Sequence, residues 1–129
     1  MDRVPIPDDV SRFILLAIPS VPYLEAILLL RRDTSQTWDY KQIARHLYLG
    51  DKAAQALLAE LHAGGIVTAA DPELLRYRYH PQSAELEQMI SRVAEVYSQD
   101  LIGVTNLIHA KANKKAQLFA DAFIWRKES

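Results

Sequence analysis

Seven residues between positions 41 and 78 have side chains suited to contact with nucleic acid: Lys41, Arg45, Lys52, Gln55, His62, Arg76 and Arg78. Lysine and arginine bind phosphate oxygens, and glutamine and lysine can hydrogen-bond to the edges of adenine and guanine. The surrounding region is not basic, because seven basic residues within positions 20–81 are balanced by seven acidic ones. The formal net charge of the whole chain is -1. This balance weighs against strong nonspecific binding to a polyanion.

Residues that would support catalysis or metal binding do not fall into a recognisable pattern. The four histidines are widely spaced, none belongs to an H-E-x-x-H motif, and there is no cysteine to complete a zinc site. The glycines match no phosphate-binding loop, and no serine lies in a G-x-S-x-G motif. We therefore expect a protein that is not an enzyme and that uses no cofactor or metal.

The sequence also bears on the compartment. The absence of cysteine is compatible with a reducing cytoplasm, and the segment Met1–Pro7 does not resemble a secretory signal. The longest apolar run, Phe13–Ile18, is too short to cross a bilayer. We expect a cytoplasmic protein that makes no membrane contact.

The elements that must position the candidate residues are mainly helical, with one small β-hairpin. Residues 1–19 form an N-terminal extension with a short helix over Asp8–Ala17, which Asp8 or Asp9 can cap. Residues 20–81 contain three helices and a hairpin. Ser20 caps the first helix, Tyr23–Arg32, and Asp39 and Gln42 have capping-box spacing at the start of the second. Asp51 caps the third helix, which ends at Gly64–Gly65, and the hairpin has strands over Ile66–Ala70 and Leu75–His80.

The segment WDYKQIARHLYLGDKAAQALLAELHAGGIV, Trp38 to Val67, resembles the helix-turn-helix core of winged-helix bacterial regulators. The matching positions are Ile43, Ala44, Leu47, Leu49, Leu57, Leu61, Gly65, Ile66 and Val67. The resemblance implies a winged helix-turn-helix domain over residues 20–81 whose second motif helix enters the major groove. It further implies that Lys52, Gln55 and His62 read bases, whereas phosphate is held by Lys41, Arg45, Arg76 and Arg78.

Residues 82–129 follow as a C-terminal amphipathic helix and tail. A single helix from Ser83 to about Ala112 would present one apolar stripe: Leu86, Ile90, Val93, Tyr97, Leu101, Val104 and Ile108. Such a helix would be about 45 Å long, longer than a small winged domain is wide. It is similar in architecture to the dimerisation helix of MarR-type and PadR-type regulators, which implies a homodimer. The alternative is that the stripe packs on its own domain.

The tail carries Phe119, Phe123 and Trp125 among several lysines and arginines. Aromatic anchors with flanking cations suit docking to another protein, or they complete the core or the dimer. Two functions therefore remain open. The first is a homodimeric transcriptional regulator that binds double-stranded DNA, and the second is a winged helix that has lost DNA binding and serves as a protein-protein interaction module.

Overall fold

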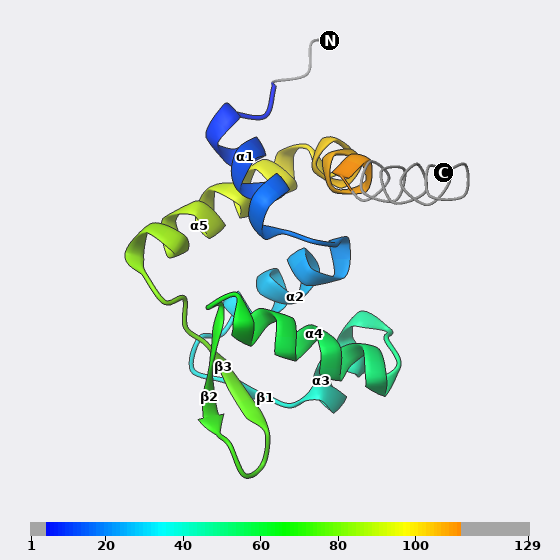
Figure 1. The fold of residues 1–129 in the computed structure, drawn as a ribbon, viewed down its shortest axis with the longest axis vertical. Coiled ribbons are helices and arrows are strands. Elements are labelled where there is room, and N and C mark those ends of the chain that lie inside the picture. The colour runs from blue at the N-terminus through cyan, green and yellow to red at the C-terminus, as the bar shows by residue number, and fades with distance from the viewer. Residues whose placement is uncertain (1–4, 112–129) are drawn as a thin grey trace, which may run out of the picture.

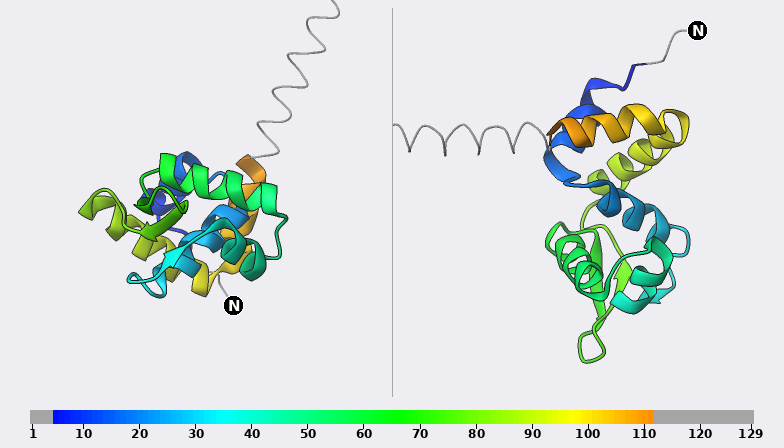
Figure 2. Two further views of the ribbon diagram at one scale, coloured as in Figure 1. Left: turned by 90° about the horizontal axis from the view of Figure 1, so that it is seen from below. Right: turned by 90° about the vertical axis from the view of Figure 1, so that its right-hand side faces the viewer.

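The computed structural model of the protein describes residues 5–111, and within them it has six helices and a small three-stranded antiparallel sheet (Figure 1). Helices α1 (Asp8–Ala17) and α5 (Ala84–Gln99) and the helical residues 101–111 gather at one end of the molecule (Figure 2). Helices α3 (Tyr40–Leu47) and α4 (Asp51–Ala63) and the sheet lie at the other end, and α2 (Val21–Arg31) lies between the two groups. A single hydrophobic core contains residues from both groups, including Ile14 of α1 and Leu61 of α4.

The two N-terminal helices follow their sequence signals. Helix α1 spans Asp8–Ala17, as predicted, and its cap position is taken by Pro7, so Asp8 and Asp9 lie in its first turn instead. Helix α2 spans Val21–Arg31, and the Ser20 hydroxyl accepts a 3.3 Å hydrogen bond from the amide of Tyr23. This bond satisfies one of the amides that a helix start leaves unpaired.

Helices α3 and α4 are separated by the three residues Tyr48, Leu49 and Gly50. Helix α3, Tyr40–Leu47, has the predicted capping box at Asp39, and it ends at Tyr48 in a left-handed conformation. Helix α4, Asp51–Ala63, begins with Gly50 at the cap position, so the prediction that Asp51 caps it is wrong by one residue. At the other end of α4, Gly65 has a φ of 75°, which glycine adopts without the steric cost that a Cβ brings.

The sheet contains one strand that the sequence did not predict. Strands β2, Val67–Asp71, and β3, Arg76–Tyr79, form the expected hairpin, which projects away from the helices (Figure 1). Strand β1 has only two residues, Thr37–Trp38, and pairs antiparallel with β3, so the strand order is β1-β3-β2. A strand of two residues therefore provides one edge of the sheet.

Helix α5 spans only Ala84–Gln99, so the prediction of a single helix from Ser83 to Ala112 is wrong. The backbone leaves the helical conformation at Asp100 (φ -143°, ψ 66°), and Asp100 Oδ1 accepts a 2.9 Å hydrogen bond from the amide of Gly103. Helical residues resume at 101–111, after a change of direction that Figure 2 shows. The carboxylate thus starts a second helix where the apolar pattern alone suggested continuity.

The apolar stripe predicted as a dimer seam lies mostly inside the protomer. Its buried members are Ile90, Val93, Tyr97, Val104 and Ile108, all part of the core. Leu86 is partly buried against that core, and only Leu101 is exposed, at 55%. Because the chain folds back at Asp100, these side chains are covered by their own protomer, as in the alternative that the sequence left open.

Within residues 5–111, no single helix has both the length and the apolar composition to cross a bilayer. Helices α1 and α2 meet those criteria only when taken together, and they are bent by 105° at the break between them.

Candidate nucleic-acid interface

Helix α4 buries one face and exposes the other. Its buried residues are Ala54, Leu57, Leu58 and Leu61, which have the i, i+3, i+4, i+7 spacing of one helix face. Lys52, Gln55 and His62 are exposed, as the base-reading prediction requires. At 100° per residue, however, the centre of the exposed face is occupied by Lys52 and by small side chains, those of Ala56, Ala59 and Ala63. Gln55 and His62 lie together on one flank.

That flank faces the β2–β3 hairpin. The ring of His62 lies 5.5 Å from the ring of Tyr77 in β3, measured between centroids, and the two rings are tilted by 57°. The partly buried Tyr77 therefore supports the side of α4 from which Gln55 and His62 project. A ligand that approaches this flank meets the hairpin as well as the helix.

The other end of α4 lies beside two cations of α3. Lys41 and Arg45 are one helical turn apart, both are exposed, and together with Ala44, Leu49 and Asp51 they line an open hollow of about 470 Å³. Gly50, the cap residue of α4, contributes no side-chain bond there, so the first amides of α4 are left to other acceptors. Asp51 places a carboxylate in the same hollow and reduces its attraction for an anion.

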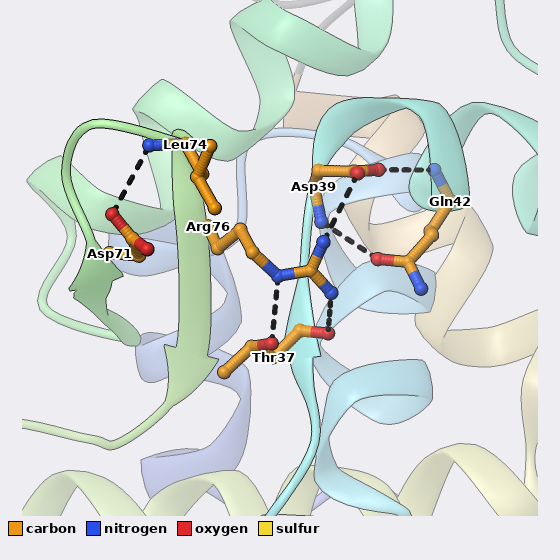
Figure 3. Close-up of polar contacts among 6 residues, drawn as sticks. All are labelled: Thr37, Asp39, Gln42, Asp71, Leu74 and Arg76. Atoms are coloured by element: carbon orange, nitrogen blue, oxygen red, sulfur yellow. Dashed lines mark hydrogen bonds and ion pairs between the residues drawn. The ribbon is translucent and has the colours of Figure 1, made fainter.

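The two arginines of β3 have different environments. Arg78 is exposed, and the strand register places it between Thr37 of β1 and Thr68 of β2. Arg76 is engaged within the protein: Nε donates to Thr37 Oγ1 at 2.9 Å, and Nη2 donates to the Thr37 carbonyl oxygen at 3.2 Å (Figure 3). Nη1 lies 3.5 Å from Asp39 Oδ2. The structure thus leaves Arg78 open to a ligand and occupies Arg76, in contrast to the sequence prediction that treated them alike.

The partners of Arg76 are the functional residues that the sequence prediction missed. The sequence identified Asp39 only as a helix cap and gave Thr37 no role. The available signal was the alternation of Arg76 and Arg78 with tyrosines, which places both arginines on one face of the strand. It could not show which strand would lie beside them, because β1 is separated from β3 by nearly forty residues.

Three buried tyrosines with raised pKa values are not part of this surface. Burial and a hydrogen bond to Glu87 raise the pKa of Tyr79, and burial and a hydrogen bond to Glu25 raise the pKa of Tyr97 to about 12. Burial, and then the charge of Glu60, raise the pKa of Tyr23. In each case the neutral phenol is favoured, so these groups serve the core and its hydrogen bonds.

The remaining predicted positions contribute no further site. Phe119, Phe123 and Trp125, the predicted docking residues, lie outside the described residues. Among residues 5–111, no group of three or more histidines, cysteines or carboxylates is arranged to hold a metal ion. Comparison of the chain with protein family profiles, with curated proteins and with solved structures finds no match. The geometry around α4 is therefore the feature that bears on function.

Proposed function

We propose that this chain is a winged helix-turn-helix protein that binds double-stranded DNA through α4. The observation that carries the proposal is the position of α4: the α3 cations Lys41 and Arg45 lie beside one end of the helix, and Tyr77 of the hairpin lies against His62 on one flank of its exposed face. The element order α2, β1, α3, α4, β2, β3, with the strand order β1-β3-β2, supports a winged-helix arrangement in which the hairpin is the wing.

In this proposal the exposed side chains of α4 have distinct roles. Gln55 pairs with adenine, and Lys52 contacts guanine or a phosphate. The methyl groups of Ala56 and Ala59 are small enough to let the helix approach the floor of the groove, where they can contact thymine methyl groups. Lys41, Arg45 and Arg78 bind phosphates and set the orientation of the helix.

We further propose that the protein acts as a homodimeric transcriptional regulator. A dimer would place two copies of α4 on successive half-sites. Because most of the predicted seam is buried within the protomer, the pairing surface cannot be the whole stripe. Leu101, the exposed member of that seam, and its neighbour Ile102 are apolar side chains that remain accessible at the start of the helical residues 101–111.

The test of DNA binding is fluorescence anisotropy with a pool of labelled 30-base-pair duplexes, measured over a series of salt concentrations. The double variant Lys41→Gln and Arg45→Gln should weaken binding and lower the slope of log K against log salt by about 1.8, or about 0.9 for each lost phosphate contact. Arg12→Gln is the matched control, because Arg12 is exposed on α1, away from α4. Equal effects of the control and the double variant would refute the interface.

A second candidate is a protein-protein interaction module, and the composition of the exposed face of α4 favours it. Three alanines lie at or near the centre of that face, and Asp51 and Glu60 are exposed beside them. A face with so little positive charge also suits close packing against a partner helix. This function predicts no shift of any duplex at 50 mM salt, a concentration at which weak phosphate binding is enhanced. It also predicts a stoichiometric protein partner that Ala59→Glu releases.

A further inference from the structure

Arg76 and Arg78 lie two residues apart on the same face of β3, but their exposure and their contacts differ. The side chain of Arg78 is exposed, whereas that of Arg76 retains only 32% of its accessible surface. In the strand register Arg76 is opposite Asp71, a carboxylate that would be a natural partner. Asp71 Oδ1 instead accepts from the amide of Leu74, at 3.2 Å, within the tip of the hairpin (Figure 3).

The guanidinium of Arg76 points across the sheet to β1 and to the start of α3. Its three nitrogens have separate acceptors: Nε bonds to Thr37 Oγ1, Nη2 to the Thr37 carbonyl oxygen, and Nη1 to Asp39 Oδ2. The planar fork of arginine can make these three contacts at once, and a lysine ammonium cannot reproduce them. The arrangement joins the hairpin strand to the residues immediately before α3.

Asp39 connects this contact to the helix itself. Its Oδ1 accepts from the amide of Gln42 at 2.9 Å, and the Gln42 side chain accepts in return from the Asp39 amide, also at 2.9 Å. Asp39 Oδ2 is the oxygen that meets Arg76. One carboxylate therefore caps α3 with one oxygen and holds the hairpin with the other, as Figure 3 shows.

We propose that Arg76 is a positioning residue that fixes the hairpin against the start of α3 and so sets the place of Arg78 relative to Lys41 and Arg45. The inference rests on the proposed DNA function, because the three cations it aligns are the proposed phosphate ligands. DNA phosphates have a fixed spacing, so cations on two separate elements bind them well only when the elements are held in register. Arg76 itself does not touch the nucleic acid.

The salt dependence of binding separates positioning from direct contact. Arg76→Gln should weaken binding to the duplex pool about fivefold, comparable to the loss of one ordinary hydrogen bond, and leave the salt slope unchanged. Arg78→Gln removes the same charge from the same strand face and should lower the slope by about 0.9. Thr37→Val removes only the Nε acceptor, keeps the net charge, and should weaken binding in the same direction as Arg76→Gln. A slope that falls in Arg76→Gln as much as in Arg78→Gln would overturn the proposal.

A second measurement, without DNA, tests the contact by itself. In NMR spectra of the free full-length chain, the Nε–H of Arg76 should give a slowly exchanging signal, because it is bonded within the protein. Thr37→Val should abolish that protection and shift the backbone amides of Asp39 and Lys41. An unprotected signal in the wild-type chain refutes the positioning role even if DNA binds. A protected signal in a chain that binds no duplex supports the contact of Arg76 with Thr37 and refutes the DNA function.

Discussion

The hydroxyl of Tyr79, in strand β3, donates a 2.6 Å hydrogen bond to Glu87 Oε2 in helix α5. Glu87 Oε1 lies 3.7 Å from Arg31 Nε of α2, and Arg31 Nη2 donates to Ser91 Oγ at 2.7 Å. The network joins the sheet, α2 and α5, the elements through which the two ends of the molecule meet. Tyr79 is buried, and the bond to Glu87 satisfies its hydroxyl there.

Replacing Tyr79 by phenylalanine should therefore destabilise the fold. The change keeps the ring and removes one hydrogen bond to a carboxylate, so we expect the free energy of unfolding to fall by about 1–2 kcal/mol in urea titrations. Tyr48→Phe is the matched control, because Tyr48 is 95% exposed and should be neutral. If both variants have the same urea midpoint as the wild type, the network does not contribute to stability.

The raised pKa of Tyr97 predicts a loss of stability in alkali. Its hydroxyl donates to Glu25 Oε1 at 2.5 Å, and burial and this bond raise its pKa to about 12, from 10.0. The unfolded chain loses the Tyr97 proton near pH 10 while the folded chain keeps it. The stabilising contribution is thus complete below pH 10 and is lost as the pH rises through 12. Circular dichroism of urea unfolding between pH 8 and 12 should show a shallower decline in Tyr97→Phe, and an unchanged decline would contradict this assignment.

Much of the fold could be predicted because its signals are local. The capping box of Asp39 and Gln42, and Ser20 with Pro22 at the start of α2, each lie within one helical turn, and the structure has both. The exposed and buried faces of α4 followed from a 3.6-residue period for the same reason. These local patterns correctly placed Lys52 and Gln55 on the outer face of α4.

The remaining features depend on contacts between distant residues. Strand β1 has two residues and exists through its pairing with β3, and Arg76 turns to partners that β1 brings beside it. The break at Asp100 interrupts an apolar pattern that continues through it. There the burial of Val104 and Ile108 against their own protomer prevails over helical continuity. The spacing of apolar residues in a sequence does not show whether the apolar face packs against its own chain or against a second subunit.

The break itself can be tested at Asp100. Asp100→Ala removes the side chain that accepts from the Gly103 amide, and loss of such a cap costs about 1 kcal/mol of folding free energy. Asp100→Asn retains an acceptor and should keep most of the stability. Gln99→Ala is the control, since Gln99 is exposed one residue earlier. If Asp100→Ala and Gln99→Ala have the same midpoint of thermal unfolding, the Asp100 cap does not stabilise the break between the two helices.

The assignment of the apolar stripe to the core predicts opposite results at two of its positions. Ile90 is 2% exposed, so Ile90→Ala should lower the free energy of unfolding by about 2–5 kcal/mol. Leu101 is 55% exposed in the protomer, and Leu101→Ala should change the free energy of unfolding of the isolated protomer by less than about 0.5 kcal/mol. If the stripe were a subunit seam, Ile90→Ala would act through dimer association, and its effect would vanish once the subunits are apart. Urea unfolding at a protein concentration low enough to give the monomer separates the two cases, because an undiminished loss for Ile90→Ala there identifies a side chain buried within one chain.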